Sequence, residues 1–243
     1  MNFKNTLTVI IIVISLMSCQ ITERVFIEED GSGKFQFEID MSGMIEAMSE
    51  FDDKKIDSNY VATDSIIKFS DILLEKKDSI SKLPKDQREK LEKLKEMTAV
   101  IHEDKLNNKM TVSYYINFNN VSEIAEMQSL MSNADSMTND KAINIHSKTR
   151  TDYSFKKNNF KRISKDKNLS ETEIEEYDNS MKDFNMFMNG STYNLEYHFP
   201  RAIKKSSAKN ATFSEDKKVI YIETTMQEAT DTPSILDFEV KLK

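Results

Sequence analysis

The sequence predicts an α+β fold, with a curved antiparallel sheet of about nine strands and helices packed on one face. Stretches that alternate between apolar and polar residues come in pairs joined by short polar turns, which is typical of β-hairpins. Each of the first three pairs is followed by apolar residues spaced three or four apart, which indicates an amphipathic helix. Hairpins followed by helices favour an antiparallel sheet that is covered on one side.

The first hairpin has the clearest pattern. Residues 34–40 alternate strictly between apolar and polar side chains, as expected for a half-buried strand. They are preceded by residues 22–29 and by the turn sequence Asp30-Gly31-Ser32-Gly33, whose residues accept a positive φ angle. A short helix over residues 41–51 follows, with Ser42 as its N-cap.

A helical insertion is predicted over residues 64–96. Apolar residues amid charge indicate a helix that begins near Asp64 and runs to about residue 82. Pro84 interrupts this helix, but proline suits a first helical turn, so a second helix is predicted from there to residue 96. The charged segment Lys82–Lys95 is interpreted as a solvated helix face, with a partner-binding helix as the alternative.

The remaining elements follow the same patterns. Residues 132–149 are polar and are expected to form a loop or a frayed helix end. The other predicted elements are a strand pair over 97–105 and 109–118, a helix capped by Asn120, a strand pair within 150–163, a helix from a Ser170/Glu173 capping box to Asn189-Gly190, and strands within 193–199, 217–226 and 235–242.

The N-terminus has the pattern of a secretory signal. Lys4 precedes an apolar run from Leu7 to Met17, which ends just before Cys19. This run of about 11 residues is too short for a membrane-spanning helix, which needs about 20. We therefore expect residues 1–18 to be removed and residues 19–243 to form one α+β domain that contains the insertion at 64–96.

The segment Leu16-Met17-Ser18-Cys19 resembles the lipobox of bacterial lipoproteins. The resemblance implies that signal peptidase II cuts before Cys19 and that Cys19 is lipidated. Two or three acyl chains hold a protein stably on a membrane, so the implied partner is a bilayer bound through Cys19. The alternative is an ordinary cleaved signal, with Cys19 as an incidental free thiol.

A second resemblance covers the C-terminal part of the chain. Tyr197-His198-Phe199-Pro200 and the later Ser214-Glu215-Asp216-Lys217 turn resemble a segment of uncharacterised Bacteroidetes lipoproteins, which implies no particular activity. Gln20 stands where an Asp retains enterobacterial relatives in the inner membrane, so outer-membrane sorting is expected. No acidic cluster follows Cys19, which favours the periplasmic face.

Composition and motifs exclude several functional classes. A formal net charge of −7 gives no electrostatic basis for binding nucleic acid. The histidines, His102, His146 and His198, match no metal-binding spacing, and the sequence contains no phosphate loop or nucleophile elbow. No cofactor, metal site or catalytic residue is therefore predicted.

Methionine is the compositional feature that could indicate binding, because flexible thioethers suit an adaptable apolar groove. The alternative is that these side chains fill an ordinary core. The leading interpretation is a non-enzymatic envelope lipoprotein with a binding or structural role; the alternatives are a carrier or chaperone for a lipid or other apolar ligand, and an unrecognised enzyme. The candidate groove residues are Met44, Met48, Met127, Met131, Met181 and Met188.

Overall fold

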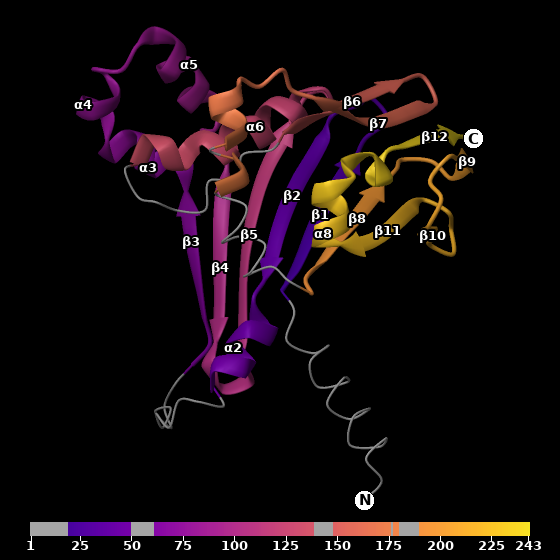
Figure 1. Ribbon diagram of the computed structural model, residues 1–243, viewed down its shortest axis with the longest axis horizontal. Helices are drawn as coiled ribbons and strands as arrows, with labels where there is room; N and C mark the ends of the chain where they lie inside the picture. The colour runs from indigo at the N-terminus through magenta and orange to yellow at the C-terminus, as the bar shows by residue number, and fades with distance from the viewer. Residues whose placement is uncertain (1–18, 50–60, 139–147, 176, 180–189) are drawn as a thin grey trace, which may run out of the picture.

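The computed structural model describes residues 19–49, 61–138, 148–175, 177–179 and 190–243. Two β-sheets and several helices make up this part of the chain (Figure 1). The α+β class predicted from the sequence is therefore confirmed, although the described strands are divided between two sheets.

The larger sheet has eight strands in the order β10-β11-β8-β1-β2-β5-β4-β3. β1 and β8 pair in parallel and the other neighbours described in this sheet pair antiparallel, so the sheet is mixed. The strands are β1 (Gln20–Ile27), β2 (Gly33–Asp40), β3 (Thr63–Lys68), β4 (Thr98–Asp104), β5 (Lys109–Phe118), β8 (Thr192–His198), β10 (Ala211–Phe213) and β11 (Val219–Thr225).

The smaller sheet has four strands in the order β6-β7-β12-β9. Its neighbouring strands pair antiparallel, and β6 and β7 form a hairpin. The strands are β6 (Thr149–Lys156), β7 (Asn159–Asp166), β9 (Ile203–Ser206) and β12 (Phe238–Leu242).

The helices lie mainly at the ends and on one side of the larger sheet. In Figure 1, α2 lies at one end of β2, β4 and β5, and the segment α3–α5 lies at the other end. The helices are α2 (Ser42–Ser49), α3 (Phe69–Glu75), α4 (Lys77–Ile80), α5 (Lys85–Lys93), α6 (Glu123–Thr138) and α8 (Met226–Asp231), with short 3₁₀ turns η1 (Lys105–Asn107) and η2 (Pro233–Leu236).

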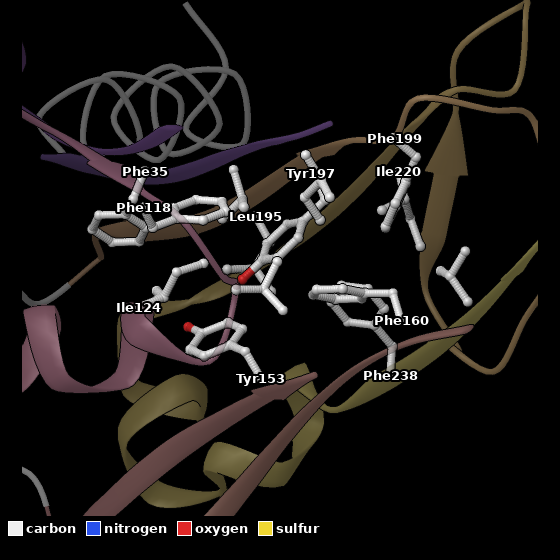
Figure 2. Packing of buried hydrophobic residues seen from close by; sticks show 14 of the residues in the cluster. Phe35, Phe118, Ile124, Tyr153, Phe160, Leu195, Tyr197, Phe199, Ile220 and Phe238 are labelled. Carbon is white, nitrogen blue, oxygen red and sulfur yellow. The ribbon is translucent and has the colours of Figure 1, made fainter. Parts of the chain in front are cut away.

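The main core joins the two sheets. Phe160 of β7 is fully buried, and its ring centre lies 5.5 Å from that of Tyr197, 5.3 Å from that of Phe199 and 5.6 Å from that of Phe238. Figure 2 shows these rings packed together, with Ile124 of α6 nearby. Aromatic packing of this kind buries a large apolar area and holds the smaller sheet against the larger one.

The predicted start of the helical insertion is wrong. Residues Thr63–Lys68 form β3, and the first helix begins at Phe69. β3 pairs antiparallel with β4, which lies about 30 residues later in the sequence. The two β-branched residues Ile66 and Ile67 also favour a strand. Together with the long-range pairing to β4, this preference outweighs the local pattern of apolar and charged residues that predicts a helix.

Other differences are smaller. α6 continues to Thr138, so residues 132–138 follow the predicted alternative of a helix end and not that of a loop. The short strands β9 and β10 were not predicted. The Ser170/Glu173 capping box is present, since Glu173 N donates to Ser170 Oγ at 3.3 Å and Ser170 N donates to the Glu173 carboxylate at 2.7 Å. The predicted helix end at residues 189–190 lies mostly outside the described residues.

Candidate functional site

A carboxylate is buried between the two sheets. Glu23 of β1 has no exposed surface, and it lies on the same face of the strand as the core residues Ile21 and Val25. Its oxygens accept hydrogen bonds from the hydroxyls of Tyr153 at 3.1 Å, Tyr193 at 3.0 Å and Tyr197, and from Gln128 Nε2 at 3.2 Å. We call these residues, with Arg162, the Glu23 cluster.

Arg162 of β7 completes the Glu23 cluster. Its side chain is 4% exposed, and its Nε lies 3.7 Å from Glu23 Oε1. Arg162 Nη1 donates to the carbonyl oxygen of Leu236 at 3.1 Å. Within the described residues, Nε has no hydrogen-bond partner. The ion pair therefore connects an interior strand of the larger sheet to the smaller sheet through charge attraction, without a direct hydrogen bond between the two side chains.

Near neutral pH the tyrosines of the Glu23 cluster are neutral and Arg162 is charged, because their pKa values lie above the ordinary range. Burial and the charge of Glu23 raise the pKa of Tyr153 and place the pKa of Tyr197 well above its ordinary value. Burial lowers the pKa of Arg162, but Tyr153 and Glu23 outweigh this effect and the net pKa is well above its usual range. With a charged arginine and neutral tyrosines sealed between sheets, the cluster is suited to holding the fold together.

The raised tyrosine pKa values predict a loss of stability in alkali. A raised pKa means that the fold favours the neutral phenol, so its contribution is complete below pH 10 and is lost as the pH rises towards the folded-state pKa. Above pH 10, each buried tyrosine should lower the free energy of unfolding by about 1.4 kcal/mol per pH unit. The free energy of unfolding, measured by urea denaturation between pH 9 and about 11, should fall less steeply with pH for Tyr153→Phe than for the unchanged chain. Tyr221→Phe is the control, because Tyr221 is exposed.

The sequence carries one signal for the Glu23 cluster, at the start of the first predicted strand. Within residues 22–29, Glu23 occupies a position whose neighbours two residues away, Ile21 and Val25, are apolar. A carboxylate on the apolar face of a strand must be paired when it is buried. The partners come from distant parts of the chain, so the sequence does not show which residues they are.

A second polar group lies on the opposite face of the same strands. Arg24 donates from Nη1 to Glu38 Oε1 at 3.0 Å and from Nε to Glu196 Oε2 at 2.9 Å. Ser113 Oγ donates to the other oxygen of Glu38 at 3.0 Å, and His198 Nε2 lies 2.6 Å from Glu196 Oε1. We call this the Arg24 cluster; it crosses the adjacent strands β8, β1, β2 and β5.

The Arg24 cluster brings a histidine together with two carboxylates. The side chains of Arg24, Glu38, Glu196 and His198 are 23–31% exposed, so ligands can reach them from solvent. The ring of His198 also stacks on Phe26, with 4.3 Å between ring centres. Across the described part of the chain, no group of three or more His, Cys, Asp or Glu residues could hold a metal ion.

His102 does not join this cluster. His102 Nδ1 lies 2.7 Å from Asp64 Oδ1 on the neighbouring edge strand, where both side chains are exposed. His146 lies outside the described residues. The structure therefore places His102 and His198 in two separate surface pairs.

Cys19 immediately precedes β1. Its side chain is 3% exposed and packs in a small apolar cluster with Ile21 and Tyr177, against which Met41 and Met44 also pack. Its carbonyl oxygen accepts a hydrogen bond from Thr192 N at 3.2 Å. Burial, followed by the charge of Asp40, raises the pKa of the thiol, so Cys19 is poorly suited to act as a free thiolate.

Two of the six candidate groove methionines have described side chains. Met44 packs against the cluster around Cys19, whereas Met127 of α6 packs against the main core. They therefore belong to different apolar clusters. The side chains of Met48, Met131, Met181 and Met188 lie outside the described residues, so the groove stays a prediction.

The comparisons with known proteins give a fold similarity. No family model and no curated protein matches the sequence. The fold is similar to the NMR structure of the folded domain of LppM from Mycobacterium tuberculosis, with a TM-score of 0.41 and 6% identity over 93% of this chain and 89% of that chain. Similarity at this level carries no conclusion about activity or ligands. Among the described residues, no helix has the length and apolar character needed to cross a membrane.

Proposed function

We propose that this chain is a lipid-anchored protein of the bacterial cell envelope that acts by binding and has no enzymatic activity. The observation that carries the proposal is the lipobox-like segment Leu16–Cys19, which follows a short apolar signal. The position of Cys19 supports it, because the domain begins at the next residue with Gln20 of β1. A lipid on Cys19 therefore holds the domain close to the bilayer. We place the protein on the outer membrane, facing the periplasm.

A lipid on Cys19 would bring one end of the larger sheet to the bilayer, and the strand register shows which elements lie at that end. Gln20 lies opposite Asp40 of β2, and Asp40 lies opposite Thr111 of β5. The turn between β4 and β5 and the helix α2 are therefore at the same end of the sheet as Cys19 (Figure 1). The side chains that pack beside Cys19 include the apolar Met41 and Met44.

Replacing the cysteine tests the anchor. Cys19→Ala should abolish labelling of the protein by radioactive palmitate and should leave the unprocessed precursor, because the acylated sulfur is absent. Ser18→Ala is the matched control, since it changes the neighbouring residue and keeps the sulfur; it should remain labelled. The anchor proposal fails if Cys19→Ala is labelled as strongly as the unchanged chain.

The binding surface that the geometry supports best is the Arg24 cluster. It offers solvent-accessible groups of both charges, and the stacked pair of Phe26 and His198 adds a flat aromatic surface. The carboxylates of Glu38 and Glu196 are both engaged by Arg24, which favours recognition over proton transfer. An unrecognised enzyme remains the less favoured reading of the same cluster, because it joins a histidine to two carboxylates.

The second candidate function is a carrier for a lipid or another apolar ligand. Met44 beside Cys19 and Met127 beside the core are the described residues that favour it. Purification of the full chain in mild detergent, followed by extraction and mass spectrometry of bound lipids, tests this function. A carrier should retain a lipid in a fixed ratio to protein after detergent exchange; loss of all lipid argues for the binding protein.

A further inference from the structure

β3 is an exposed edge of the larger sheet. It pairs with β4 on one side, and all six of its residues, Thr63–Lys68, are exposed. Figure 1 shows β3 as the outermost strand beside β4. A strand in this position presents N–H and C=O groups that can pair with a strand of another chain. Natural sheet edges are often protected by proline or by a bulge, and β3 has no proline and pairs with β4 in continuous register.

Exposed apolar side chains are concentrated around this edge. Ten large apolar side chains in the described part of the chain are exposed, and five of them lie between residues 61 and 74. Exposed apolar groups gathered in one place indicate an interaction surface. The five are Val61 at 74%, Ile66 at 65%, Ile67 at 41%, Ile72 at 37% and Leu74 at 74%.

The charges of β3 complement a second copy of β3. When two identical strands pair antiparallel about a two-fold axis, one residue must lie opposite its own copy across the axis. This follows because hydrogen-bonded and non-hydrogen-bonded residue pairs alternate along the strands. We describe that residue as lying on the axis. With Ile66 on the axis, Asp64 of each copy lies opposite Lys68 of the other, and the two Ile66 side chains meet. An axis at Ser65 or at Ile67 places a charged residue opposite Ile66 instead.

We propose that two copies of this chain pair antiparallel through β3, with Ile66 on the two-fold axis. The pairing joins the two eight-stranded sheets edge to edge and packs the two Ile66 side chains against each other. The two cross-strand pairs of Asp64 with Lys68 fix the register, as opposite charges do between neighbouring strands. This pairing does not depend on lipidation of Cys19.

The symmetry also sets the orientation of the two copies. The axis of an antiparallel pair is perpendicular to the sheet, so the Cys19 ends of the two copies point in opposite directions. Copies anchored to one bilayer all face it with the same end. Copies anchored on the periplasmic face of one outer membrane therefore cannot pair in this way, and the pairing joins copies released from that membrane.

Cross-linking of the full chain, purified in detergent, tests the register. Ile66→Cys should form an intermolecular disulfide under mild oxidation, because the two residues meet on the axis within the range that a disulfide spans. Thr63→Cys is the matched control on the same exposed strand: its two copies lie about 20 Å apart in this register. We expect at least five-fold more dimer from Ile66→Cys. Both variants retain Cys19, so disulfides through Cys19 appear equally in each.

Charge reversal tests the proposed contact. In the Ile66→Cys chain, Lys68→Glu should reduce cross-linking at least five-fold, and adding Asp64→Lys should restore it, because the two pairs are then reversed in sign. Both residues are exposed, and circular dichroism verifies that each variant is folded. The proposal is overturned if Ile66→Cys and Thr63→Cys cross-link equally, or if neither charge change alters the cross-linking of Ile66→Cys. It is also overturned if the chain remains monomeric and does not cross-link.

Discussion

Arg162→Met should lower the free energy of unfolding by about 3–5 kcal/mol, the usual cost of removing one partner of a buried ion pair. Methionine fills much of the same volume, so the main change is electrostatic. Glu23 then remains fully buried without its cation, and the carbonyl oxygen of Leu236 loses a hydrogen bond. Urea denaturation followed by circular dichroism measures the difference.

Two further variants separate the charge effect from the loss of packing. The double variant Glu23→Gln/Arg162→Met removes both charges, and we expect it to recover at least half of the lost stability, because no unpaired charge is left inside. Lys161→Met is the matched control on the same strand: Lys161 is exposed and pairs with Glu239 on the surface, so it should cost less than about 1 kcal/mol. A single variant Arg162→Met as stable as the unchanged chain contradicts this account.

Local patterns were sufficient to predict most of the hairpins. The strict alternation over residues 34–40 and the Asp30–Gly33 turn correspond closely to the observed pair of β1 and β2. The same holds for β4 with β5 and for β6 with β7, where the partners are close in sequence. In each case the alternation gives the buried face and the turn gives the register, so neighbouring residues contain the necessary information.

Long-range pairing is what the sequence patterns could not supply. β1 lies parallel to β8, more than 160 residues away, and this pairing places β1 in the interior of the larger sheet. The local pattern over β3 predicts a helix, whereas the observed strand depends on its pairing with β4, which is also non-local. The division into two sheets depends on these distant contacts, which is why a single sheet was expected.

The two polar clusters were missed for the same reason. Glu23 meets side chains from α6, β6, β7 and β8, and Arg24 meets carboxylates from β2 and β8. Glu23 and Arg24 are neighbours on β1, so their side chains point to opposite faces of the sheet; the face of Glu23 is buried and that of Arg24 is accessible. The position of Glu23 on an apolar strand face is a local signal, but the spacing of acidic and basic residues along the chain does not show the partners in either cluster.

Gly33→Ala should destabilise the fold by about 3 kcal/mol through steric overlap in the first hairpin. Gly33 begins β2 and lies opposite Ile27 of β1. A methyl group at this position overlaps the carbonyl oxygen of Phe26 and lies 2.7 Å from the ring of Phe118, which is buried in the core. A backbone carbonyl cannot turn aside as a flexible side chain can, so the pairing of β1 and β2 must distort.

Gly31→Ala in the same turn distinguishes steric overlap from backbone strain. Gly31 has a φ of +86°, and its nearest neighbour, Phe155, allows a methyl group at an ordinary distance of 3.5 Å. Gly31→Ala should therefore lower the free energy of unfolding by about 1–2 kcal/mol, through the left-handed backbone conformation alone. Gly31→Asn should lower it less, because asparagine tolerates this conformation. Thermal unfolding of the three variants should rank Gly33→Ala lowest. If Gly33→Ala is no less stable than Gly31→Ala, close approach of the strands is not the reason for glycine at position 33.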